Sequence, residues 1–203
     1  LLYPIENLGN PIGRVMIPIL SRMQDDPQGY RRAYLQASGF LSLLIMPGMG
    51  VAIVCAHDVV QLLLGERWLP VAAIFFWLGI AGLAQPVLIA TQWLYLAEGR
   101  ASDLMRVSVF SSLVIATGFL IGIRWGAVGV ASAYACAELL VRVPLQIFFA
   151  GRGLVRHIDL IIEFVPQLIA FGFSGLMIIF LQQIDVDGWR LIVLGLIIAY
   201  ANA

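Results

Sequence analysis

The sequence predicts an all-α protein, a polytopic bundle of transmembrane helices, on three observations. Of its 203 residues, 61% are hydrophobic and 12% are charged, whereas soluble domains average about 45–50% and about 25%. The mean hydropathy is +0.95. Long uncharged tracts alternate with short charged clusters, which is typical of membrane spans separated by loops. These observations exclude an ordinary soluble domain.

The first twenty residues are mostly apolar but carry several residues that disfavour a regular membrane helix. We interpret 1–20 as the broken end of an earlier transmembrane span that lines something polar, since proline interrupts helical hydrogen bonding. The residues behind this interpretation are Pro4, Glu6, Pro11, Arg14 and Pro18.

The next segment, 21–34, is predicted to be a basic loop on the cytoplasmic side. Within it, Asp26 is a favourable N-cap and Pro27 a favourable first helical residue. We therefore expect a helix to begin at this point and to continue into the first complete span.

The uncharged tracts that follow predict a transmembrane bundle over 35–203, with five complete spans and a truncated sixth. Roughly 20 apolar residues are needed to cross about 30 Å of hydrocarbon. Because the last tract is too short to cross, and because the chain begins at Leu1, we expect an internal fragment of a longer protein. The expected spans are about 35–56, 69–97, 104–123, 126–149 and 160–182, with the truncated span at 190–203.

Arginines in the loops predict the orientation of these spans. The connections 21–34, 98–106 and 150–158 hold two or three arginines each, whereas the intervening connections hold one each. Short arginine-rich loops stay on the cytoplasmic side of the membrane. We therefore expect the three arginine-rich loops at the cytoplasmic face and Arg67, Arg124 and Arg190 at the opposite face.

Several local signals refine this prediction. The segment 59–68 is typical of a short interfacial helix that stops at Gly65. Ser102 or Asp103 is expected to cap the span that follows it. Four prolines lie within spans and should kink them. They are Pro47, Pro86, Pro144 and Pro166.

Small residues recur at a spacing of four around one connection, which predicts close helix packing or, alternatively, a sliding surface for a conformational change. They are Gly118, Gly122 and Gly126, followed by Gly129, Ala133 and Ala137.

Glu138 and Arg142 are the most informative residues, because they lie one helical turn apart near the expected bilayer midplane. An ionisable group there costs at least about 2.5 kcal/mol when exposed to lipid. One interpretation is a mutually neutralised structural pair. The other is a cavity acid that takes a proton or cation beside an arginine that holds an anionic substrate group. Arg14, Arg124 and Glu163 are further candidates for substrate binding or ion coupling.

Composition and motifs exclude several other function classes. A net charge of zero argues against a nucleic-acid partner. Cys55 and Cys136 lie in apolar tracts without metal-ligand spacing, and the adjacent His57 and Asp58 are typical of an ordinary loop. Because no nucleophile elbow, P-loop or dinucleotide fingerprint occurs in the sequence, we expect no enzyme, no catalytic residue, no metal and no cofactor.

Short loop and boundary motifs resemble a known family. They are Pro18-Ile19-Leu20-Ser21-Arg22, Gln24-Asp25-Asp26-Pro27, Tyr30-Arg31-Arg32-Ala33-Tyr34, Leu63-Leu64-Gly65-Glu66-Arg67-Trp68 and Gly99-Arg100. Together they resemble the second half of bacterial oligosaccharide flippases of the polysaccharide transporter family (Wzx type), within the multidrug/oligosaccharidyl-lipid/polysaccharide exporter superfamily. The resemblance extends over roughly residues 8–150.

The resemblance implies the second bundle of a two-bundle, alternating-access transporter, with multiple spans in the bacterial inner membrane. Its substrate would be polyprenyl-diphosphate-linked oligosaccharide, flipped across that membrane for lipopolysaccharide or exopolysaccharide biosynthesis. Membrane lipid and polysaccharide assembly proteins would be its other partners.

Two hypotheses complete the sequence analysis. In the first, Arg142, with Arg14 or Arg124, lines a cationic cavity, and Glu138 couples transport to an ion gradient. The alternative is a membrane-embedded polysaccharide polymerase or ligase of the same pathway. Such an enzyme needs a sizeable outer loop with arginine or histidine, and the outer loops here are short and poor in both.

Overall fold

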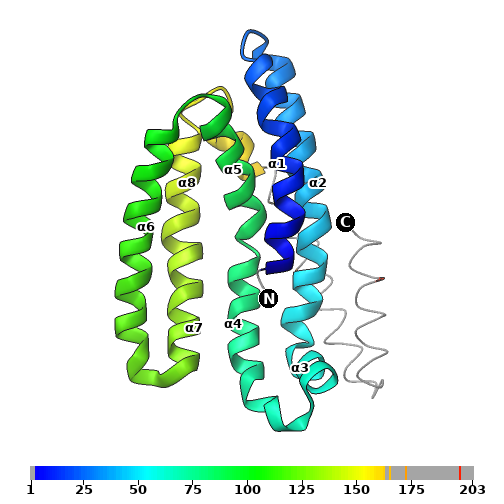
Figure 1. Cartoon of the computed structure of the whole chain (residues 1–203), viewed down its shortest axis with the longest axis vertical. Helices are drawn as coiled ribbons and strands as arrows, with labels where there is room; N and C mark the ends of the chain where they lie inside the picture. The colour runs from blue at the N-terminus through cyan, green and yellow to red at the C-terminus, as the bar shows by residue number, and fades with distance from the viewer. Residues whose placement is uncertain (1–2, 163–164, 166–171, 173–196, 198–203) are drawn as a thin grey trace.

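The structure is a computed structural model that describes residues 3–162 and the single positions 165, 172 and 197. Among these residues all regular structure is helical and there is no strand, as expected for an all-α bundle. Figure 1 shows long helices running side by side in opposite directions, joined by short turns at the two ends of the molecule.

The first two helices form an antiparallel pair. Helix α1 (Tyr3–Arg22) is continuous through Pro11 and Pro18, where the sequence suggested a broken span. Both proline residues are exposed, so each removes one backbone hydrogen bond without placing its ring in the packed face of the helix. The connection that follows is shorter than the predicted loop, because α2 (Pro27–Val54) already contains Arg31 and Arg32.

The predicted start of α2 is confirmed. The side chain of Asp26 accepts a hydrogen bond from the backbone N–H of Gly29 at 3.0 Å, and Pro27 is the first helical residue. The predicted glycine stop is confirmed as well. Helix α3 (Ala56–Leu64) ends at Gly65, whose φ of 84° lies in the region that other residues rarely adopt.

The tract from Glu66 to Ala97 is helical but not one straight helix. A 3₁₀ segment η1 (Glu66–Val71) leads into α4 (Ala72–Gly82), and after a turn at Leu83 and Ala84 the chain continues as α5 (Gln85–Ala97). Pro86 lies in the first turn of α5, where a missing N–H is tolerated. The kink predicted at Pro86 is therefore present, as a break between α4 and α5.

A hairpin of two long arms follows. Helix α6 (Ala101–Gly122) reverses through a 3₁₀ turn η2 (Ile123–Trp125) into α7 (Gly126–Ala137), as Figure 1 shows. The returning arm passes through a π-helical turn η3 (Glu138–Arg142) into α8 (Val143–Ala150). The predicted cap of α6 is wrong, because Arg100 occupies the cap position and no side chain caps the helix. The carboxylate of Asp103 instead accepts hydrogen bonds from Arg100.

The arms of this hairpin pack closely through the predicted small residues. The backbone of Gly122 lies so close to Gly129 that a Cβ at Gly122 would be 2.6 Å from the Gly129 carbonyl oxygen. Farther from the turn, a Cβ at Gly118 would be 3.7 Å from the Cβ of Ala133, an ordinary contact. The contact is therefore tightest next to the turn, as expected for small residues that let helix backbones approach.

Three helical segments among the described residues are long and apolar enough to cross a membrane: Pro27–Val54, Glu66–Ala97 and Ala101–Ala150. The last includes both arms of the hairpin. The expected spans 35–56, 69–97, 104–123 and 126–149 fall on these segments, although their passage through a bilayer stays a prediction. The expected spans 160–182 and 190–203 lie almost wholly outside the described residues.

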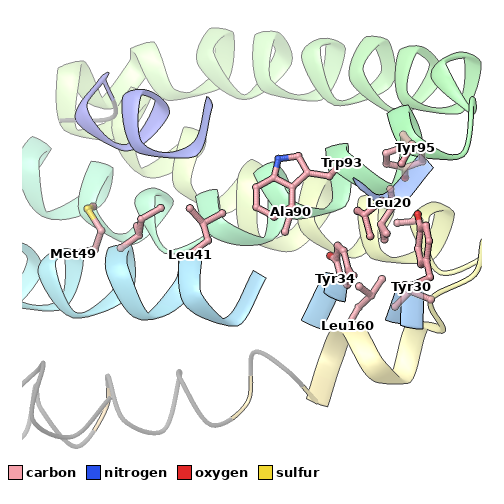
Figure 2. Packing of buried hydrophobic residues seen from close by; sticks show 14 residues of the cluster. Leu20, Tyr30, Tyr34, Leu41, Met49, Ala90, Trp93, Tyr95 and Leu160 are labelled. Carbon is pink, nitrogen blue, oxygen red and sulfur yellow. The ribbon is translucent and has the colours of Figure 1, made fainter. Parts of the chain in front are cut away.

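The main core lies between α1, α2 and α5, continues along α2 as far as Met49, and includes Ala150, Val155 and Leu160. Figure 2 shows Tyr30 and Tyr34 of α2 with Trp93 and Tyr95 of α5 around Leu20. The hairpin is much less buried than this core. In the most apolar stretch of Pro27–Val54, 56% of the residues are buried, whereas in the most apolar stretch of Ala101–Ala150 only 11% are buried. Its apolar surface is therefore suited to contact with lipid.

Candidate functional site

A polar cavity of about 580 Å³ lies among α1, α5, α6 and the returning arm of the hairpin. Its size falls within the range of small-molecule binding sites, about 300–1,000 Å³. Six polar or charged side chains line it, and they come from five different elements. They are Arg14, Gln85, Gln92, Ser108, Arg142 and Gln146.

The cavity brings together two of the predicted site residues, Arg14 of α1 and Arg142 of η3. None of the described residues that line it is acidic. Guanidinium groups bind carboxylate and phosphate through paired N–H donors. The cavity is therefore suited to an anion.

Glu138 contacts Arg142 but does not line the cavity. Its Oε1 atom accepts a hydrogen bond from an Arg142 terminal nitrogen at 2.7 Å, and its side chain is fully buried, whereas 30% of the Arg142 side chain is exposed. Arg142 thus lies between a buried carboxylate and the cavity. The predicted pairing of Glu138 and Arg142 is present, and Arg142 borders the cavity.

The pair is incompletely satisfied among the described residues. The second carboxylate oxygen of Glu138 and the Nε atom of Arg142 are buried without a hydrogen-bond partner. A buried carboxylate with a free oxygen is costly, so its presence in a folded protein needs a specific explanation such as a functional role.

The π-helical turn determines where Arg142 points. Pro144 has no N–H and cannot donate to the helix, and the N–H of Val143 instead bonds the carbonyl of Glu138, five residues back. A π turn adds one residue to the helical turn and changes the direction of its side chains, and such turns are frequent at functional sites. The kink predicted from Pro144 is therefore a local widening of the helix beside the cavity.

A buried polar contact joins α5 and α8 beside the cavity. The side-chain amide of Gln146 forms a hydrogen bond with the hydroxyl of Thr91 at 2.5 Å, and the hydroxyl of Tyr95 donates to the backbone carbonyl of Gln146 at 3.0 Å. These two α5 residues lie one turn apart, so Gln146 is fixed at both its backbone and its side chain.

Two predicted site residues lie elsewhere. Arg124 is exposed in η2 at the tip of the hairpin, at the opposite end of α6 from the residues Leu104 and Ser108 that line the cavity. The structure does not bring it together with Arg14 and Arg142. Glu163 lies outside the described residues.

Sequence reasoning missed the amide side chains of the cavity. Gln85, Gln92 and Gln146 lie in tracts that were identified only by their lack of charge. Polar residues within membrane segments are costly and face a partner or a cavity. Their presence in otherwise apolar tracts was the signal that could have found them.

The arginine-rich loops converge at one end of the bundle. The carboxylate of Glu98 accepts hydrogen bonds from Arg100 at 3.1 Å and from the backbone N–H of Leu154 at 3.0 Å. Arg31 of α2 pairs with Asp159 at 2.5 Å. These contacts link the segment 98–106 to 150–158, and the segment 21–34 to Asp159, the residue that directly follows 150–158. The three connections predicted to share one side of the membrane therefore share one end of the molecule.

Arg100 stays positively charged within this network. Burial acts to lower the pKa of its guanidinium, but hydrogen bonds to Glu98 and Asp103 act in the opposite sense and raise the pKa above its ordinary value. Because a raised pKa of a base stabilises the folded protein at every pH below its ordinary value, this contribution is constant across the physiological range.

Comparisons with known proteins agree with the resemblance seen in the sequence. The family described as "Polysaccharide biosynthesis protein" matches residues 1–73. The lipopolysaccharide biosynthesis protein WzxC of Escherichia coli (strain K12) is 24% identical over 140 residues, which are 68% of this chain and 28% of that protein. The chain is therefore similar to proteins of polysaccharide biosynthesis, one of them a Wzx protein.

A second relative is named as a membrane protein. An uncharacterized membrane protein in the cps region of Klebsiella pneumoniae is 26% identical over 172 residues, which are 81% of this chain and 35% of that protein. The chain thus spans about a third of the length of the curated relatives it matches. No solved structure matches it. The comparisons indicate a membrane protein of polysaccharide biosynthesis.

Proposed function

We propose that the complete protein is a flippase that moves polyprenyl-diphosphate-linked oligosaccharide across the bacterial inner membrane. In this proposal the described chain supplies a wall of the cavity that holds the charged headgroup. The observation that carries the proposal is the cavity itself, in which Arg14 and Arg142 face one space and no acid is found among the described lining residues. A diphosphate is the part of such a substrate that two guanidinium groups would bind.

The experiment measures export of lipid-linked oligosaccharide by the complete protein, expressed in a strain whose own copy of this protein has been deleted. Arg14→Gln and Arg142→Gln should each reduce export at least tenfold, because each removes a charge-assisted contact to the diphosphate. Arg124→Gln is the matched control, since Arg124 is an exposed arginine outside the cavity.

The readouts are the lipid-linked repeat units on each face of the membrane and the abundance of each variant. Normal export by both cavity variants at normal abundance would contradict the proposal. Delivery of repeat units to the outer face with a failure of chain extension would favour the polymerase or ligase instead.

We also infer that Glu138 couples transport to an ion gradient. Diphosphate that binds Arg142 would compete with the Glu138 carboxylate for the same guanidinium. A buried carboxylate that loses its partner is unstable as an anion and would take up a proton or a cation. Release of that ion on the other side would return Glu138 to Arg142.

Glu138→Gln tests this coupling, because it keeps the shape of the side chain and removes its charge. In vesicles that contain the complete protein, we expect the variant to lose the acceleration by an imposed proton or sodium gradient. Slow transport without a gradient should remain. Full gradient acceleration in the variant would show that Glu138 has no coupling role.

A further inference from the structure

Three amide side chains line the cavity, and the diphosphate does not account for them. Gln85 and Gln92 lie seven residues apart on α5, two turns along the same face of the helix. Gln146 faces the cavity from α8. The amides thus come from two helices that pack against each other beside the arginines.

Gln146 is held in a defined orientation. It is 2% exposed, and its side-chain amide forms a hydrogen bond with the hydroxyl of Thr91 at 2.5 Å. One end of this amide is therefore held by Thr91, and its other end is left for the cavity. A polar group fixed in advance binds with a smaller loss of conformational freedom.

Amide groups have a different chemistry from the guanidinium groups beside them. A guanidinium only donates hydrogen bonds, which suits the acceptor oxygens of a diphosphate, whereas a carboxamide both donates and accepts. Hydroxyl and acetamido groups of sugars also do both. A cavity with two cations and three amides therefore matches a ligand with an anionic part and a hydroxylated part.

We propose that Gln85, Gln92 and Gln146 bind the sugars that follow the diphosphate and make the cavity selective for the glycan. This inference rests on the function proposed above and assigns a role to residues that the diphosphate leaves unused. The arginines would anchor any polyprenyl diphosphate, and the amides would distinguish the sugars attached to it.

The experiment compares two probes that share the anion and differ in the sugar. The complete protein, purified in detergent, is titrated with polyprenyl diphosphate and with the same lipid diphosphate carrying the oligosaccharide repeat unit. The variant Gln85→Ala/Gln92→Ala should bind the glycan-bearing probe about tenfold more weakly, as expected for the loss of hydrogen bonds to neutral groups. Its affinity for the bare lipid diphosphate should change less than twofold.

Gln61→Ala is the matched control, since Gln61 is an exposed glutamine of α3 outside the cavity. It should bind both probes like the unmodified protein. Equal weakening of both probes by Gln85→Ala/Gln92→Ala, or no weakening of either, would overturn the inference. Retained binding of the bare probe also shows that the variant is folded.

The proposed function fails in a different way. Arg14→Gln and Arg142→Gln should weaken binding of both probes, because both probes carry the diphosphate. If these arginine variants bind both probes normally while the glutamine variant discriminates between them, the cavity binds glycans and the diphosphate anchor is wrong. If the arginine variants bind both probes more weakly and the glutamine variant binds both probes normally, the proposed role of the amides is wrong.

Discussion

For the pair of Glu138 and Arg142, the effect of removing either residue depends on what surrounds that residue. Its spacing was visible in the sequence, and the two interpretations, structural and functional, were equally compatible with that spacing. The structure adds an asymmetry, because Glu138 is fully buried while Arg142 borders the cavity. Removal of one partner therefore has a different cost from removal of the other.

We predict that Arg142→Met destabilises the protein by about 3 kcal/mol, because it leaves a buried carboxylate unpaired. Glu138→Leu should cost less, since Arg142 can still reach the polar cavity. The double variant Glu138→Leu/Arg142→Met should recover most of the stability and none of the transport. Thermal unfolding in detergent and export of lipid-linked oligosaccharide are the measurements.

The double variant also separates the two interpretations of the pair. If it recovers both stability and transport, the two residues serve only to neutralise each other. Similar costs for the two single variants would contradict the asymmetry seen in the structure.

At the scale of elements, α6 and α7 pack against each other through their backbones beside the turn, whereas most helix pairs pack through side chains. Gly122 and Gly129 meet beside the turn, and the separation widens toward Gly118 and Ala133. Both glycines of α6 belong to one small-residue row, so the sequence pattern alone gives them the same importance. The structure distinguishes them by what a Cβ would meet.

We predict that Gly122→Ala destabilises the protein by about 1–3 kcal/mol, because the new Cβ would overlap the carbonyl oxygen of Gly129 and backbone has little room to move. Gly118→Ala is the matched control and should be neutral or stabilising by up to about 1 kcal/mol, since alanine favours the helix and its contact is ordinary. Thermal unfolding of both variants in one detergent tests this. Equal effects at the two positions would show that the arms separate more easily than the structure indicates.

At the scale of the whole molecule, the arginine-rich loops predict how the bundle is oriented in the membrane. The charged network of Glu98 and Arg100, with the pair of Arg31 and Asp159, holds the arginine-rich connections together at one end. Arg67 and Arg124 lie in the turns at the other end of the bundle, as the positions of η1 and η2 show. The alternation of arginine counts in the sequence thus corresponds to two physical ends.

We predict that cysteines placed at Arg22 and Arg106 react with a membrane-impermeant maleimide from the cytoplasmic side only. Cysteines at Arg67 and Arg124 should react from the opposite side only, because short arginine-rich loops are retained in the cytoplasm. All four positions are exposed. Labelling of intact cells and of inside-out vesicles is the measurement.

The background for this labelling is the complete protein with Cys55→Ala and Cys136→Ala, since Cys136 is exposed and would add its own signal. Reaction of positions 22 and 106 from different sides would contradict the convergence of the loops. Reaction of all four from one side would contradict the passage of these segments through the membrane.

The features predicted from sequence were those with a local cause. Apolar tract length determines where helices can span a membrane, Asp26 and Pro27 determine where α2 begins, and Gly65 determines where α3 ends. These depend on a few neighbouring residues, so they can be deduced without knowledge of the fold. The cap expected at Ser102 or Asp103 failed because Asp103 is occupied by Arg100, which is itself bound to the carbonyl of Phe149.

The site depended on packing between helices that are distant in sequence. Whether Arg14 or Arg124 accompanies Arg142 could not be deduced, because only the arrangement of α1, α5 and the returning arm places Arg14 at the cavity. The amides were missed for the same reason, since a glutamine in an apolar tract shows what it faces only when its neighbours are known. Length, hydropathy and caps are properties of one segment, whereas a cavity is a property of several segments together, and tertiary packing alone creates it.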